Sequence, residues 1–348
     1  MRSGSTWRWR RQPAAPTRST SRRSSRGDAA IATPALERLR PWLDSAGVEA
    51  ACLTDPTSIA YLTGFRANPH ERLMALAVRA DRAALVVPAL EREAAEAALE
   101  RAGEVEVRPW GDGDDPYTLL GAALGAGATM AVEKDHLTLA RAEQIQLRLP
   151  ETRFLDAGAE VRRLRATKTG PELELMERAA RLTDEVMERT LAGLAPGQTE
   201  LSISIRATSA IGDLGAAPSF DALVQSGPHS AQPHLAPTGR PLAAGDLVLL
   251  DLGAAWEGYA GDLTRMAVLG EPDARQVELH ALVLAAHDAA VAAVRTGATA
   301  GAVDAAAREV IAAAGLGDFF IHRVGHGLGL QAHEGPSLDP GSAIVLET

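Results

Sequence analysis

The chain has 348 residues, a formal net charge of −10 and 46% hydrophobic residues, a size and composition that suit about two globular domains. Residues 1–27 contain eight arginines and no acidic residue, so the remainder is more acidic than the whole and we expect no nucleic-acid partner. No apolar run is long enough to span a bilayer, so we expect no membrane partner. The single cysteine, Cys52, favours a reducing, cytoplasmic location.

The first 31 residues differ in composition from the rest of the chain. They are rich in arginine and serine and lack the apolar segment of a secretory signal. Such a composition predicts a disordered basic tail at 1–31, because it offers too little apolar surface to bury. A transit-like segment or an arm for an anionic surface would have the same composition.

Helical and strand-like patterns alternate across residues 32–160, which predicts an α/β domain. The first helix is expected at 33–47, with Thr33 as its N-cap, Pro34 in its first turn and Gly47 as its end. Further helices are expected at 89–103 and 137–149, and strands at 49–55, on either side of 79–82, at 105–110, at 128–134 and at 153–158.

A second domain is predicted at 161–348. Thr169-Gly170-Pro171-Glu172 opens a long helix with an apolar stripe. Helices at 200–212, 273–295 and 301–314, strands at 222–225 and 319–322, a hairpin at 247–269 and a short run at 343–346 complete the domain. The order helix, helix, strand, strand occurs twice, so we expect a duplicated unit that repeats in element order only and has a shortened second hairpin.

Two acidic residues flank the turn of the predicted hairpin. Asp251 ends the apolar run 247–250, and Asp262 follows the turn. If the turn is centred between Trp256 and Glu257, the two acids lie directly opposite each other, and a shift by one residue makes them diagonal neighbours on the same face. Two carboxylates so close repel each other unless a cation compensates. The pair therefore predicts a divalent metal site, and the alternative is a solvent-facing strand with two unrelated acids.

Four histidines accompany the acids. His234 lies in SGPHSAQPHLAPTGR, and His322, His326 and His333 lie in HRVGHGLGLQAHEGP. A neutral imidazole can bind Zn, Mn, Co or Fe, or can donate to a developing oxyanion. Any one of these histidines is more simply explained as structural or exposed. Together with the acid pair they indicate a metal-dependent site.

These segments together resemble the pita-bread metallopeptidases, and within them the Xaa-Pro aminopeptidases and Xaa-Pro dipeptidases (prolidases). The likeness is carried by VLLDLGAAWEGYAGDLTR, SGPHSAQPHLAPTGRPL and HRVGHGLGLQAHEGP. TKTGPELELMERAA resembles the opening of their catalytic domain, and DPTSIAYLTGFRANPHERLMALAV resembles their creatinase-like N-terminal domain. The resemblance implies a mixed α/β (α+β) fold: a creatinase-like α/β domain at 32–160, then a pita-bread catalytic domain at 161–348.

The resemblance also implies a role for each site residue. Asp251 would bind one metal ion, Asp262 would bridge two, and His326 would bind the second. Three further histidines would line the substrate site and stabilise the tetrahedral intermediate or the leaving group: His234, His333 and, at a more variable position, His322. The family uses two divalent ions (Mn, Co or Zn) and a bridging hydroxide that attacks the bond preceding proline. The implied partners are an Xaa-Pro dipeptide or a short peptide with proline second, and a second copy in a homodimer.

The sequence departs from the family pattern in one respect. The family has two further ligands, both glutamates on its last strands, and one of them is also the general base. The 348 residues end at Thr348, before those strands, and neither Glu334 nor Glu347 matches a ligand position. We therefore expect a pita-bread domain without its last strands, which binds divalent metal weakly and hydrolyses Xaa-Pro substrates barely or not at all.

Two other functions remain open on the sequence. A creatinase-like, metal-free C–N hydrolase would share the fold. Such relatives lose metal ligands, whereas this sequence keeps Asp251, Asp262 and His326. A non-catalytic pseudoenzyme or binding module would keep the fold for partner recognition. The sequence separates neither aminopeptidase from dipeptidase specificity nor Mn from Co or Zn.

Overall fold

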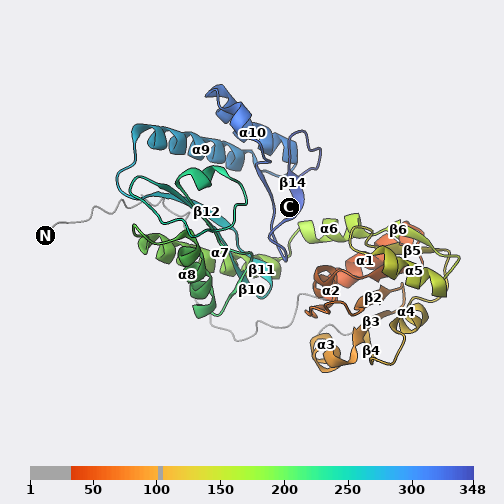
Figure 1. Cartoon of the computed structure of the whole chain (residues 1–348). Coiled ribbons are helices and arrows are strands. Elements are labelled where there is room, and N and C mark those ends of the chain that lie inside the picture. The colour runs from red at the N-terminus through yellow and green to blue at the C-terminus, as the bar shows by residue number, and fades with distance from the viewer. Residues whose placement is uncertain (1–32, 101–104) are drawn as a thin grey trace, which may run out of the picture.

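The computed structural model describes residues 33–100 and 105–348, so the predicted basic tail lies outside the described residues. Two units succeed each other along the chain, and α6 leads from the first to the second (Figure 1). In the part of the chain that is described, no helix is long and apolar enough to cross a membrane.

The first unit is built on a six-stranded sheet with the strand order β4-β3-β2-β1-β5-β6. The β1–β2 and β2–β3 pairs are antiparallel and the other pairs are parallel. Its elements are α1 (Thr33–Ser45), β1 (Ala50–Leu53), α2 (Pro56–Thr63), β2 (Ala75–Val78), β3 (Ala83–Pro88), η1 (Ala89–Glu91), α3 (Arg92–Leu99), β4 (Val105–Trp110), α4 (Pro116–Leu124), β5 (Thr129–Val132), α5 (Leu139–Arg148), β6 (Arg153–Asp156) and α6 (Gly158–Ala166).

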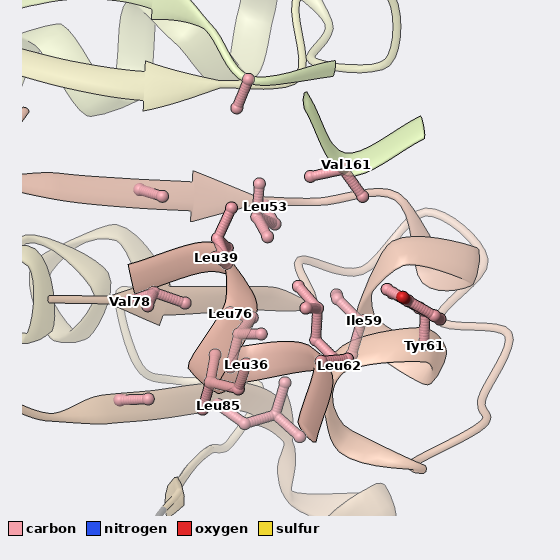
Figure 2. Close-up of a cluster of buried hydrophobic side chains, with 14 of the residues drawn as sticks. Leu36, Leu39, Leu53, Ile59, Tyr61, Leu62, Leu76, Val78, Leu85 and Val161 are labelled. Atoms are coloured by element: carbon pink, nitrogen blue, oxygen red, sulfur yellow. The ribbon is translucent and has the colours of Figure 1, made fainter. Parts of the chain in front are cut away.

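Both faces of this sheet are buried, each by a different set of helices. Along β1, Ala51 and Leu53 belong to one apolar core, and Ala50 and Cys52 belong to the other, because successive side chains of a strand point to opposite faces. Figure 2 shows the first core, which includes Val161 of α6. The predicted boundary after residue 160 therefore falls inside a helix that packs on the first unit.

Three helices of the first unit were not expected from the sequence: α2, α4 and α6. Helices α2 and α4 are predominantly apolar, so they show no polar face to mark a helical period. Each nevertheless begins with a readable signal. Asp55 and Asp115 cap the two helices, each accepting a backbone N–H two residues on, and a proline comes after each of them in the first turn.

The second unit combines helices with small antiparallel sheets. Strand β9 lies between β8 and β12, and β10 lies between β7 and β11. Its elements are α7 (Gly170–Ala192), α8 (Glu200–Asp213), β7 (Ala217–Pro218), β8 (Leu223–Ser226), η2 (Gly227–Ala231), β9 (Leu247–Leu252), β10 (Ala254–Trp256), β11 (Tyr259–Ala260), β12 (Leu263–Val268), α9 (Ala274–Ala293), α10 (Ala300–Ala313), η3 (Gly317–Phe319), β13 (Gly325–Gly327) and β14 (Glu334–Leu338).

The expected duplication is present in its two helix pairs, α7 and α8 in the first copy and α9 and α10 in the second, and backbone hydrogen bonds at the start of the second helix of each pair correspond. The amide of Glu200 donates to the carbonyl of Arg240 at 3.2 Å, and in the second copy the amide of Ala300 donates to the carbonyl of Ile344 at 2.8 Å. Three more backbone bonds correspond in the same way: Gly197–Leu242 with Gly297–Leu346, Leu242–Gln198 with Leu346–Ala298, and Leu201–Thr238 with Gly301–Ser342. The two copies thus share a pattern of backbone hydrogen bonds as well as the order of their helices.

The strand predicted at 319–322 is also wrong. Residues 317–319 form the short helix η3, and the next residues make no ladder. The guanidinium of Arg308 donates instead to the carbonyls of Phe320 and His322, at 2.7 and 2.9 Å. A side chain thus satisfies the backbone acceptors that a strand partner would have satisfied, and the strands of this region are β13 and β14.

Candidate metal and substrate site

The hairpin places Asp251 and Asp262 on one face of the sheet but not directly opposite each other. Asp251 of β9 pairs with Thr264 of β12, so the turn lies one residue further along than the directly opposed register requires. The turn residues Glu257 and Gly258 have φ values of 46° and 77°, the positive values that a two-residue type I′ hairpin needs. The diagonal arrangement is therefore the correct one.

Both carboxyl groups lie in a partly desolvated environment. Burial raises the pKa of Asp251 above its ordinary value, and the charge of Asp262 raises it further, although the Thr264 hydroxyl donates to its Oδ1 at 2.8 Å. Burial also raises the pKa of Asp262, against the opposing effect of His326. Neither acid is paired with a lysine or arginine among the described residues, so this pair carries uncompensated negative charge when ionised.

Strands β13 and β14 bring His326 and His333 together. Their rings lie 4.1 Å apart between centroids, with 31° between the ring planes. The Nδ1 of His326 lies 3.0 Å from the carbonyl oxygen of Gly327. Because a carbonyl can only accept, Nδ1 carries a hydrogen, and Nε2 is the ring nitrogen that faces the acid pair. This Nε2 lies 3.6 Å from Oδ2 of Asp262.

His333 is held in its neutral form by its surroundings. Burial, then the neighbouring His326 and Arg323, lower its pKa below the ordinary value. His234, on the segment between β8 and β9, lies near enough to His333 and Asp251 to contribute to lowering the pKa of each. It is exposed and has a φ of 63°, a backbone conformation that few residues other than glycine adopt.

His322 lies apart from the other three histidines in its contacts. Its ring packs edge-on against Phe320 at 5.0 Å, and its Nδ1 lies 2.7 Å from the carbonyl oxygen of Arg323. The side chain is exposed. The structure thus brings together Asp251, Asp262, His326 and His333, with His234 facing them, and leaves His322 at the edge.

The donor set suits a divalent ion in its chemistry. Carboxylate oxygens and a neutral imidazole nitrogen are ligands for Mn, Co and Zn, and Oδ2 of Asp262 and Nε2 of His326 lie close enough for one cation to contact both. Within residues 33–100 and 105–348, however, no three His, Cys, Asp or Glu side chains form a group close enough to hold a metal ion. Among the described residues, Asp262 and His326 thus form a close pair of possible ligands, but no third ligand joins them in a closed coordination sphere.

A cationic pocket of about 260 Å³ adjoins His333. It is lined by Arg162, Arg165, Arg323, Gln331, His333, Glu334, Gly335 and Ser337. Arg162 and Arg165 are engaged by the carboxylates of Asp135 and Glu334. Arg323 donates instead to the uncharged Ser337 hydroxyl at 2.7 Å, so its charge remains available to a ligand.

Sequence reasoning missed several residues around the site. Arg323 stands next to His322 in the histidine segment, and its charge was the available signal. Glu200 and Gln225 are buried under the segment that carries His234. Glu200 is the first residue of α8, directly after the N-cap Thr199. Acidic residues are common in the first turn of a helix, so nothing in the sequence around Glu200 indicated a further role.

Comparisons with known proteins show which family the chain belongs to. Residues 174–348 match the model of metallopeptidase family M24, and residues 36–167 match that of the creatinase/prolidase N-terminal domain. An Xaa-Pro dipeptidase of Lactobacillus helveticus is 35% identical over 90% of this chain and 86% of its own. A dipeptidase of Pyrococcus horikoshii OT3 superposes with a TM-score of 0.83 at 34% identity, covering 90% of this chain and 87% of that one. The prolidase of Pyrococcus furiosus gives 0.80 at 30% identity, covering 88% of each.

Proposed function

Since the chain belongs to metallopeptidase family M24, we propose that it hydrolyses the bond preceding proline in Xaa-Pro dipeptides, using two divalent ions held by Asp251, Asp262 and His326. The observation that carries the proposal is the placement of His326 Nε2 at 3.6 Å from Oδ2 of Asp262, on the sheet face that Asp262 shares with Asp251. The chain is a metallopeptidase of the Xaa-Pro dipeptidase type, so a metal-free C–N hydrolase is not favoured.

Each residue of the site would have its own task. Asp251 would bind one ion, Asp262 both ions and His326 the other ion. Bound divalent ions supply Lewis acidity, which acidifies water and polarises the scissile carbonyl. His333 is neutral near pH 7, so one of its ring nitrogens carries a hydrogen. That N–H can donate a hydrogen bond to the substrate carbonyl or to the leaving nitrogen. His234 would act on the substrate from the facing segment.

The Arg-lined pocket supports a dipeptide rather than a longer peptide as the substrate. The C-terminal carboxylate of an Xaa-Pro dipeptide lies one residue beyond the scissile bond, so it is close to the reacting carbonyl. Arg323 lies beside His333, and its guanidinium can form charge-assisted hydrogen bonds to that carboxylate. In a longer peptide an uncharged amide would stand there and would gain less from this contact.

Outside the site, the proposal includes a homodimer. Three large apolar side chains of the first unit, Leu90, Leu139 and Leu147, are 71–81% exposed, and a second copy could cover them. Light scattering of the purified chain tests this part separately.

The function is tested by proline release from Ala-Pro in excess Mn²⁺, measured against Asp251→Asn. Because the variant lacks one of the proposed metal ligands, even a slow reaction of the parent is detected as the difference between the two. Mn²⁺ binding by calorimetry should weaken in Asp251→Asn and in His326→Ala. Equal proline release by parent and Asp251→Asn, together with unchanged Mn²⁺ binding, would contradict the proposal.

The part played by Arg323 is tested with Ala-Pro-amide, which lacks the carboxylate. Arg323→Gln should weaken the binding of Ala-Pro by about 10–100-fold, the range of 1.4–2.8 kcal/mol expected for a charge-assisted hydrogen bond. It should leave Ala-Pro-amide unaffected. Arg162→Gln is the matched control, because Arg162 lines the same pocket but is engaged by Asp135. An equal loss on both ligands would remove Arg323 from carboxylate recognition.

A further inference from the structure

Glu200 is a fully buried carboxylate at the start of α8, and its hydrogen bonds all reach one segment. Its Oε1 accepts from the amide and hydroxyl of Ser226, at 2.8 and 2.7 Å. Its Oε2 accepts from the amide and hydroxyl of Thr238, at 3.1 and 2.6 Å. The Nδ1 of His229 lies 3.1 Å from both oxygens. One side chain thus holds the beginning, the middle and the end of residues 226–238, the segment that carries His234.

Gln225 braces the same segment near its tip. Its side-chain amide donates to the carbonyls of Gln232 and Leu235, at 2.8 and 3.0 Å, so it spans the two residues between them, one of which is His234. Gln225 is buried in β8, and its neighbour two residues back, Leu223, pairs with Asp251. The amide therefore rises from the sheet face that carries Asp251.

These contacts are not required by the repeated fold itself. In the second copy Ala300 takes the place of Glu200 and keeps the corresponding backbone bond, to Ile344. Ala300 is also fully buried, so an apolar side chain is accommodated where the first copy has an acid. Both copies present histidines to the site, His234 in the first copy and His326 and His333 in the second, but only the first has a carboxylate at this helix position.

The acid is charged in this environment. Burial opposes its ionisation, but the bonds from Thr238, Ser226 and His229 together hold the pKa of Glu200 below its ordinary value. Nearby, Arg240 donates to the Ser226 hydroxyl at 2.5 Å and pairs with Asp246 at 2.7 Å. All donors to this buried carboxylate come from one segment. If the segment moved, the carboxylate would lose hydrogen bonds that water does not replace, so the charge keeps the segment ordered.

We propose that Glu200 and Gln225 are positioning residues that hold His234, in its left-handed backbone conformation, over the sheet face of Asp251. Glu200 sets the two ends of the segment and Gln225 sets its tip. Neither contacts the substrate. The proposal rests on the proposed function for the role of His234, but the geometry that it describes is measurable without catalysis.

The first test tracks the His234 imidazole by NMR and the amide hydrogen exchange of residues 227–237 in Glu200→Gln and in Gln225→Ala. Both variants should shift or split the His234 ring signal and raise exchange in this segment, while the amides of α8 stay protected. Glu133→Gln is the matched control, because Glu133 is also a buried carboxylate that accepts two backbone amides, those of Thr54 and Asp55, but lies in the first unit. An unchanged His234 signal in Glu200→Gln, or an equal change in Glu133→Gln, overturns the proposal.

The second test is a double-mutant cycle on proline release. Glu200→Gln should slow turnover by about 100-fold, the effect of misplacing a site residue by roughly 1 Å. If Glu200 acts through His234, the double variant with His234→Ala should lose no more than His234→Ala alone, whereas independent losses that multiply would refute the coupling. A parent without proline release refutes the proposed function instead, and the NMR and exchange measurements then decide this proposal by themselves.

Discussion

Asp251 and Asp246 stand near the two ends of β9 in opposite electrostatic surroundings. Asp246 pairs with Arg240 at 2.7 Å, and this contact holds its pKa below the ordinary value. Asp251 is partly buried beside Asp262, and burial raises its pKa. One strand therefore carries an acid that stabilises the metal-free fold and an acid that destabilises it.

We expect Asp251→Asn to raise the thermal midpoint of the metal-free protein at pH 7 by roughly 2–4 °C, the shift that about 1 kcal/mol produces in a domain of this size. A raised pKa means that the folded state binds the proton more tightly, so the destabilisation is absent below the ordinary pKa and grows as the pH rises through the raised value. The gain should accordingly vanish at about pH 4. Asp246→Asn, measured in the same calorimetric series, should instead lower the midpoint at pH 7, and a loss in both variants would contradict this account.

At the residue scale, the sequence predicted the sheet face on which each acid lies, which the two-residue period of a strand determines. The shared face of Asp251 and Asp262 results from the alternation of side chains, whichever of the two registers holds. The contacts of Glu200 with Ser226 and Thr238 join residues 26 and 38 positions apart, and no local pattern encodes them. Residues that act through such distant contacts appear only once the fold is known.

At the scale of elements, the hairpin turn depends on Gly258 for two separate reasons. Its φ of 77° is strained for any side chain, and a Cβ atom would overlap the guanidinium of Arg66, which donates to the carbonyl of Glu257 at 2.8 Å. Gly215 has a nearly equal φ of 74°, but a Cβ atom there would meet nothing within 4 Å. A substitution at Gly215 therefore measures the backbone strain without the clash.

Gly258→Ala should therefore cost more folding free energy than Gly215→Ala, by about 0.5–1.5 kcal/mol, the usual contribution of a hydrogen bond, because the exposed Arg66 side chain must move aside and lose its bond to Glu257. Denaturant unfolding of both variants measures the difference. In an Arg66→Ala background, where the guanidinium is gone, the two substitutions should cost nearly the same. A difference that persists without Arg66 would show that the turn itself, and not its contact with the first unit, sets the cost.

Contacts beyond the local pattern decided two features of the second unit. The hairpin register stayed open between two alternatives because the period of a strand fixes a face but not a register, which here depends on the positive φ values of Glu257 and Gly258. The strand expected at 319–322 failed because Arg308 satisfies its carbonyls from α10. Long helices such as α7 and α9 were predicted within a few residues, since their ends are set by local capping boxes.

At the scale of the whole molecule, Arg165 of α6 links the first unit to the site. Its guanidinium pairs with Glu334, the residue directly after His333, and lies 3.9 Å from Oδ2 of Asp55. Both Arg165 and Glu334 are nearly inaccessible, with 6% and 5% of their side chains exposed, and Lys168 lies 3.5 Å from Glu334. A buried pair of this kind ties the position of β14 to the docking of the first unit.

Arg165→Met should destabilise the protein by about 3–5 kcal/mol, because it leaves the carboxylate of Glu334 buried beside Lys168 alone. Arg163→Met, on the same helix but with 61% of its side chain exposed, should cost less than about 1 kcal/mol. Adding Glu334→Gln to Arg165→Met removes the second charge and should recover a large part of the loss. Calorimetry measures all three, and equal losses for Arg165 and Arg163 would mean that the pair between the units contributes nothing. Because Glu334 adjoins His333, the single variant should also shift the His333 ring signal, which makes the docking of the first unit a determinant of the site's geometry.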